Sequence, residues 1–183
     1  MNPTLRDTSK AAAAIAGALI AATFLIALVV DLGFGANARR WLAFGFAGLP
    51  ARPPEAVSIF QHNVRALLAV AGLLVIAQTP YWGGERQPGP AHQLVRGAGE
   101  VLLAAAVLAN VAVVGASFGA YGARMIRAAL PHGPLELGAF SLALGLYMKG
   151  RHQRIPVGLM TVVATVSVAG LALAALLEVY VTV

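Results

Sequence analysis

The stretch of sequence best suited to chemistry is residues 131–137, which read Pro-His-Gly-Pro-Leu-Glu-Leu. His132 and Glu136 are four positions apart, and residues at this spacing lie on one face of a helix that includes both. An imidazole and a carboxylate held together could bind a metal ion, transfer protons or bind a charged group of a partner. Pro134 suits the first turn of a helix, where the helix dipole also favours Glu136. The structural alternative is a capped helix end in which Glu136 pairs with His132 or an arginine.

Two other polar sites lie at the ends of apolar stretches. Glu178 follows the last apolar stretch, where the helix dipole disfavours a negative charge, so a cation or protonation must compensate it. His62, Asn63 and Arg65 open an earlier stretch, where polar side chains can cap free backbone N–H groups. His62, Arg65, Arg124 and Arg127 are the candidate cations for Glu178. The candidate catalytic and metal-ligating residues are His132, Glu136 and Glu178, and the candidate partner- or substrate-binding residues are these three with His62, Asn63 and Arg65.

The elements that must position these side chains are apolar stretches of membrane-spanning length. Hydrophobic residues make up 59% of the chain and charged residues 11%, whereas a soluble domain carries about a quarter charged residues. A bilayer core about 30 Å thick requires roughly 20 apolar residues per helix. We therefore predict an all-α fold, a polytopic membrane bundle of about five transmembrane helices forming one domain over residues 1–183. The predicted spans are residues 11–30, 58–78, 98–119, 129–148 and 157–178.

Chain direction alternates between successive spans, so the starts of the second and fourth spans share one membrane face with the ends of the others. The second and fourth stretches reach spanning length only by including polar flanks at 58–63 and 129–134. The sequence thus predicts one polar face, and its members are Asp31, His62, Asn63, Arg65, His132, Glu136 and Glu178. Lys and Arg are divided almost evenly between the two sides, and the dense loop at 149–154 weakly favours a cytoplasmic N-terminus.

Several remaining features limit the function. The first apolar run is longer than a signal-peptide core, so we expect a retained anchor. Residues 39–46, Arg-Arg-Trp-Leu-Ala-Phe-Gly-Phe, are typical of a short interfacial helix. The chain has no cysteine, and its net charge of +6 is scattered over loops, which favours headgroup contact over nucleic-acid binding.

Small residues four apart, beginning at Gly17, Gly115 and Gly170, predict close helix packing. Asn110 is expected to bond a neighbouring helix, and Glu100 to compensate a helix dipole.

Three runs together resemble the stage II sporulation protein M family. They are Phe60-Gln61-His62-Asn63, the run from Leu130 to Leu137 that continues to Gly145, Leu146 and Gly150, and the tail Leu177-Glu178-Val179-Tyr180-Val181-Thr182. Their order, their spacing and the five-span layout agree with the family from about residue 55 onward. The chain departs from the pattern at His62, where many members carry a second Asn, and in the loop at 81–93.

The resemblance implies a membrane accessory or scaffold subunit without enzymatic activity of its own. Such proteins accompany a peptidoglycan hydrolase complex during engulfment, or an ABC transporter beside circular-bacteriocin genes, in maturation, export or immunity. Usage rich in Ala, Arg and Gly suggests a high-GC bacterium, so we do not carry over the sporulation role. The expected location is the bacterial cytoplasmic (inner) membrane, with a multi-pass topology, the lipid bilayer and another membrane protein as partners, and no nucleic acid.

Two alternatives remain open at this point. An intramembrane metal-dependent hydrolase or peptide-processing enzyme could use His132, Glu136 and Glu178, with His62, to bind Zn²⁺. The His-Glu-x-x-His signature is absent from the sequence, which weakens this interpretation. A proton-coupled carrier or channel could use the two glutamates as titrating groups, although few polar residues fall mid-span. No cofactor is expected apart from the Zn²⁺ of the hydrolase alternative.

Overall fold

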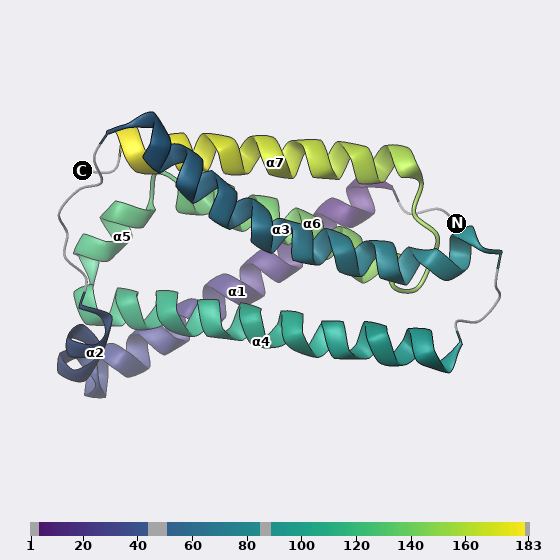
Figure 1. The fold of residues 1–183 in the computed structure, drawn as a ribbon. Helices are drawn as coiled ribbons and strands as arrows, with labels where there is room; N and C mark the ends of the chain where they lie inside the picture. Colours follow the sequence, from purple (N-terminus) through teal and green to yellow (C-terminus); the bar gives the residue numbers. More distant parts are fainter. Residues whose placement is uncertain (1–3, 44–50, 85–88, 182–183) are drawn as a thin grey trace.

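The computed structural model describes residues 4–43, 51–84 and 89–181, and among these residues it has seven helices and no strand (Figure 1). Four helices are long: α1 Leu5–Gly33, α3 Pro53–Trp82, α4 Pro90–Tyr121 and α7 Val157–Tyr180. Three are shorter: α2 Gly35–Leu42, α5 Ala123–Ala129 and α6 Gly133–Gly150. The predicted all-α class is confirmed.

Four helices, α1, α3, α4 and α7, are long and apolar enough to cross a membrane. This finding supports the prediction of a membrane protein. Helix α6, which occupies most of the predicted fourth span, is not among the four. It has 18 residues, with Glu136 in its first turn and Lys149 in its last. At about 1.5 Å per residue it is about 27 Å long, close to the thickness of a bilayer core. The count of five spans therefore stays a prediction.

The helix boundaries differ from the predicted spans, and proline accounts for most of the differences. Helices α3 and α4 begin at Pro53 and Pro90, ahead of the predicted starts, because proline is tolerated in a first helical turn. The fourth predicted span, 129–148, begins at the last residue of α5 and otherwise corresponds to α6, which starts four residues later. Pro131 follows α5 and lacks the N–H that would extend it, and α6 begins only at Gly133. The predicted interfacial helix corresponds in part to α2, which begins at Gly35, while residues 44–50 lie outside the described part of the chain.

Helix α1 runs diagonally across the bundle and packs against two helices (Figure 1). Its first half contacts α6, where a Cβ on Gly145 would lie 2.9 Å from both the Ala12 nitrogen and the Thr8 carbonyl oxygen. Its second half contacts α4, where a Cβ on Gly119 would overlap the Ala27 carbonyl. Glycine is required at both contacts, because the opposing atoms belong to the backbone and cannot move aside.

The predicted small-residue pairs differ in what they do. The pair beginning at Gly115 packs α4 against α1, and the pair beginning at Gly170 packs α7 against α6. A Cβ added to Gly17 would meet nothing within 4 Å, so among the described residues this glycine makes no close helix contact. Asn110 was expected to bond a neighbouring helix, but it is exposed on the side of α4. In a membrane that side faces lipid or a partner chain.

Helices α3, α6 and α7 enclose the main apolar core. Its members are almost all aliphatic, and Leu171, Leu146 and Ile155 are among the most deeply buried. This packing aligns the starts of α3 and α6 with the ends of α1, α4 and α7 (Figure 1). We call this the polar end of the bundle. The helix directions therefore alternate as predicted.

Candidate functional site

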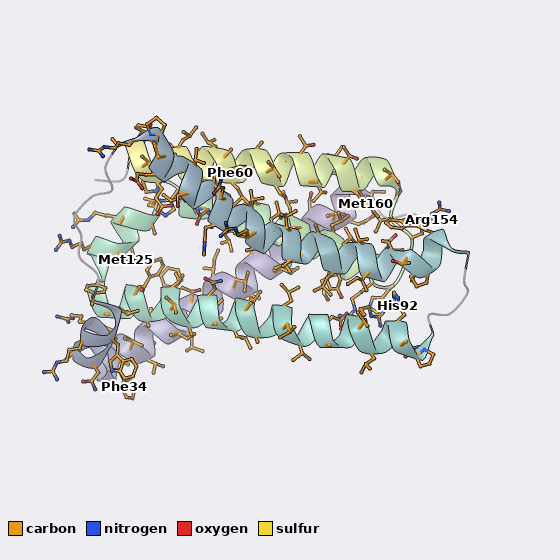
Figure 2. All side chains as sticks on the ribbon, viewed as in Figure 1. Phe34, Phe60, His92, Met125, Arg154 and Met160 are labelled. Atoms are coloured by element: carbon orange, nitrogen blue, oxygen red, sulfur yellow. The ribbon has the colours of Figure 1, made fainter. Side chains whose placement is uncertain are left out.

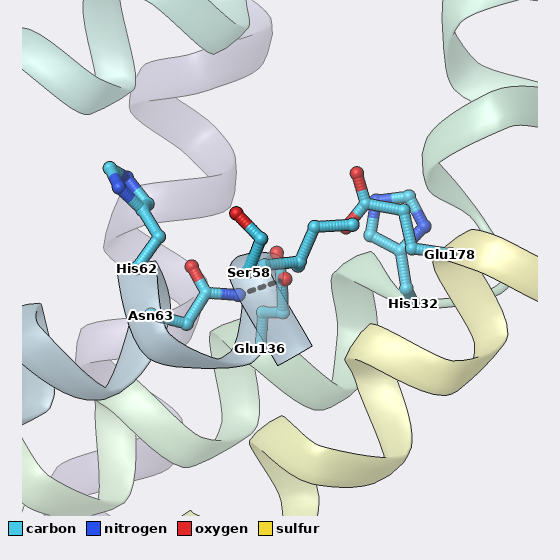
Figure 3. Close-up of a pocket in the computed structure, with 7 residues that line it drawn as sticks. Ser58, His62, Asn63, His132, Glu136 and Glu178 are labelled. Atoms are coloured by element: carbon cyan, nitrogen blue, oxygen red, sulfur yellow. Dashed lines mark hydrogen bonds between the residues drawn. The ribbon is translucent and has the colours of Figure 1, made fainter. Parts of the chain in front are cut away.

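A pocket of about 380 Å³ opens at the polar end, between α3, α6 and α7 (Figure 3). Its lining residues are Ser58, Ile59, His62, Asn63, His132, Glu136 and Glu178. Five of them belong to the predicted polar face. They come from three segments that lie far apart in the sequence, so the fold gathers side chains that no local motif connects.

Helix α6 fixes Glu136 at the base of the pocket. His132 is the residue that precedes the helix, and its carbonyl oxygen accepts hydrogen bonds from the Leu135 N–H at 3.0 Å and the Glu136 N–H at 3.2 Å. Pro134 occupies the first turn, as its position predicted. His132 and Glu136 thus both lie at the N-terminus of α6, although His132 itself is just outside the helix and its ring lies beside Glu178 in Figure 3. The local sequence is sufficient to place these two residues.

Asn63 connects α3 to α6 through the glutamate. Its Nδ2 donates a hydrogen bond to Glu136 Oε1 at 2.6 Å, shown as a dashed line in Figure 3. We expected Glu136 to pair with His132 or an arginine. His132 lies close enough to act electrostatically on Glu136, and the hydrogen bond comes from the Asn63 amide. An amide donor carries no charge, so this hydrogen bond by itself is not an ion pair.

The pocket is lined by both carboxyl and imidazole groups. The titratable side chains that act electrostatically on Glu136 are His132, Glu178 and His62. Glu136 and Glu178 are both partly buried, whereas His62 is exposed. Two carboxylates in one partly buried pocket repel each other, so a cationic or hydrogen-bond-donating group would be favoured between them. The pocket is therefore suited to bind a polar group with positive charge or N–H donors.

The metal prediction gains no support from this geometry. Among the residues that the structure describes, no three His, Asp or Glu side chains are placed to hold a metal ion. His132, Glu136 and Glu178 line the same pocket without forming such a group. Ser58 also lines the pocket, but its neighbours do not form the Gly-x-Ser-x-Gly sequence of a nucleophile elbow.

Two residues of the predicted polar face lie at the polar end without lining the pocket. Arg65 is exposed on α3, and Asp31 is exposed near the end of α1. Ser58 and Ile59, conversely, line the pocket but were not predicted. They lie one turn before His62 on α3. The predicted span began at residue 58, whereas α3 begins at Pro53, so both residues lie within the helix and not at its start.

A second polar cluster, absent from the sequence prediction, lies toward the opposite end. Tyr147 Oη donates a hydrogen bond to Glu100 Oε1 at 2.6 Å, and the Nε atoms of Arg96 and Arg151 each lie 3.7 Å from the same oxygen. Glu100 was interpreted as dipole compensation ahead of a span. It instead lies inside α4 and joins that helix to α6, because α4 begins ten residues earlier at Pro90.

Gln78 is another buried polar residue that the sequence analysis missed. Its side chain is fully buried, and its Nε2 donates to the carbonyl oxygens of Gly150 at 2.6 Å and Gln153 at 3.0 Å. Its Oε1 accepts a hydrogen bond from the Ile155 N–H at 2.8 Å. Gln78 therefore fixes the connection from α6 to α7. The available signal was a glutamine at the last position of the predicted second span, 58–78.

Comparison of the chain with models of known protein families, with curated proteins and with solved structures finds no match. The resemblance to the stage II sporulation protein M family thus continues to depend on the three runs of residues themselves. Those runs supply most of the lining of the pocket.

Proposed function

We propose that this protein is a membrane accessory or scaffold subunit, similar to stage II sporulation protein M, with the pocket at its polar end as the partner-binding site. The observation that supports the proposal is the meeting of the three family-like runs. Asn63 comes from the first run, Glu136 from the second and Glu178 from the third, and all line one pocket. A resemblance in short separate motifs has functional meaning when the motifs form a common site.

The form of the pocket favours binding over catalysis. The Asn63 amide already engages one oxygen of Glu136 (Figure 3), and the remaining polar groups line an open pocket. The sequence has no Gly-x-x-x-x-Gly-Lys loop for nucleotide phosphates, so energy from ATP must come from another chain. We infer that the partner is a membrane protein of an envelope-remodelling or peptide-maturation and export complex, such as an ABC transporter or a peptidoglycan hydrolase assembly, in the bacterial inner membrane.

This proposal includes α6 as a fifth membrane-spanning helix. Helix α6 is packed between α1, α3 and α7, so much of its surface is shielded from lipid by the chain itself. A helix shielded in this way can cross the membrane with less apolar character than one that faces lipid. Its two charged residues lie in its first and last turns, where they reach the interfaces.

The test is a pull-down of the tagged protein from its native membrane in mild detergent, with partners identified by mass spectrometry. Glu136→Gln should reduce recovery of the partner by about tenfold or more, since a hydrogen bond to a charged group contributes about 1.5–3 kcal/mol. Glu55→Gln is the matched control, because Glu55 lies on α3 outside the pocket lining. Equal recovery with both variants, or no specific partner for the wild-type protein, would contradict the proposal.

A further inference from the structure

Two short helices beside the spans carry four arginines between them. Helix α2 contains Arg39 and Arg40, and α5 contains Arg124 and Arg127. All four side chains are exposed. Neither residues 34–43 nor residues 122–130 include Asp or Glu. The two helices therefore form a strongly basic part of the polar end, separate from the pocket.

Both helices are attached to the same end of α4. Helix α2 packs against α4, and the Tyr121 hydroxyl donates a hydrogen bond to the Arg39 carbonyl oxygen at 3.4 Å. Helix α5 follows α4 after Gly122, whose positive φ of 57° forms a sharp corner that favours glycine. Figure 1 shows α2 and α5 near this end of the bundle, and in Figure 2 Phe34 and Met125 lie at the end opposite His92 and Arg154.

The same two helices also expose large apolar side chains. Trp41 on α2 is 90% exposed, and Leu130, directly after α5, is 65% exposed. Phe34, at the start of α2, is 57% exposed. Exposed aromatic and aliphatic residues next to arginines are typical of segments that lie in the headgroup layer, with apolar groups directed to the acyl chains. Because α1 and α4 are long and apolar enough to cross a membrane, their ends would place both short helices at that level.

We propose that α2 and α5 form a binding surface for anionic phospholipid headgroups. The guanidinium groups of the four arginines bind lipid phosphates, and Trp41 inserts at the interface beside them. Guanidinium recognises phosphate through paired N–H donors, which a zwitterionic lipid satisfies less well because its own cation competes. An acidic soluble partner would account for the arginines, but it would leave the exposed Trp41 and Leu130 without an apolar environment. This surface is independent of the pocket and of the proposed partner.

The experiment uses Trp41 as a reporter in the full-length Trp82→Phe protein, since these are the two tryptophans of the chain. The protein is reconstituted in vesicles of equimolar phosphatidylglycerol and phosphatidylcholine, with either lipid brominated as a quencher. We expect brominated phosphatidylglycerol to quench Trp41 more than brominated phosphatidylcholine. The preference should fall as salt is raised, because the attraction is electrostatic and partly screened.

A charge-matched pair of double variants separates a local site from a general effect of net charge. Arg40→Gln with Arg127→Gln should reduce the preference for the anionic lipid by about 25-fold, given about fivefold for each basic residue near an anionic surface. Arg6→Gln with Arg154→Gln removes the same charge from exposed residues at the opposite end and should leave the preference unchanged. Equal quenching by both lipids in the parent protein would overturn the proposal, and so would an equal loss in the two double variants. Because all four substituted residues are exposed, both variants should fold, and circular dichroism checks this.

Discussion

Replacing Gln78 with leucine should strongly destabilise the bundle, although the substitution makes α3 more apolar. Leucine has nearly the same size as glutamine but can form none of its three hydrogen bonds. The change leaves the carbonyl oxygens of Gly150 and Gln153 and the N–H of Ile155 without their side-chain partner. Gly150 and Ile155 are buried, whereas Gln153 is partly exposed and can be hydrated.

The magnitude follows from the two buried groups. Each buried backbone group that loses its partner costs about 1–3 kcal/mol, so the expected loss is about 2–6 kcal/mol in the free energy of unfolding. The added apolar surface offsets little of this loss, because the unfolded chain in a micelle already shields leucine from water. Even the lower value shifts the unfolding equilibrium by about 30-fold.

The assay is a titration of the protein from mild-detergent micelles into dodecyl sulfate, followed by the fluorescence of Trp82 in the Trp41→Phe background. Trp82 lies one turn after Gln78 on α3, so it reports on this part of the bundle. Gln61→Leu is the matched control on the same helix, since Gln61 is exposed and its replacement should change stability by less than about 0.5 kcal/mol. If Gln78→Leu unfolds at the same dodecyl sulfate concentration as Gln61→Leu, the three hydrogen bonds do not hold the α6–α7 connection.

Two further predictions concern helix packing and the second polar cluster. Gly119→Leu should separate α1 from α4 and cost about 3 kcal/mol or more, because its Cβ would overlap the Ala27 carbonyl, whereas Gly17→Leu should be tolerated where nothing lies within 4 Å. The same titration measures both variants, and equal stability would refute the proposed packing. Tyr147→Phe should cost about 1.5–3 kcal/mol by removing the hydrogen bond to Glu100, and an unchanged midpoint would show that water replaces the hydroxyl.

Hydropathy and alternating helix directions predicted which polar residues would lie at one end of the bundle. A polar residue at the end of an apolar stretch has few places to lie in a membrane, and alternating helix directions bring alternate ends together. These two constraints place His62, Asn63, Glu136 and Glu178 in one region, and all four line the pocket. The two constraints predict at which end of the bundle a residue lies, but not toward which neighbouring helix its side chain is directed. Arg65 lies on α3 at the same end and does not line the pocket.

The pairing of side chains was less predictable, because it depends on contacts between helices that are distant in sequence. Asn63 rather than an arginine bonds Glu136, and this choice depends on the rotation of α3 relative to α6. The same applies to Tyr147 and Glu100, which are 47 positions apart. Short helices are also difficult to predict from sequence, because they contain too few turns for a hydrophobic periodicity to be recognised. Helix α5 has only seven residues, and Pro131 determines where it ends.

The two polar groups of the bundle show why residue type alone does not distinguish a binding site from a structural contact. Glu100 receives a hydroxyl hydrogen bond and has two guanidinium groups 3.7 Å from one oxygen, so its charge is compensated within the chain. Glu136 receives an amide hydrogen bond and shares an open pocket with a second carboxylate, Glu178. The first arrangement compensates its carboxylate within the chain, whereas the second places two acidic side chains in an open pocket where the hydrogen bond to Glu136 comes from an uncharged amide. A partner that supplies N–H donors or positive charge would complete it, and this difference is the physical basis for assigning binding to the pocket and stability to the Glu100 cluster.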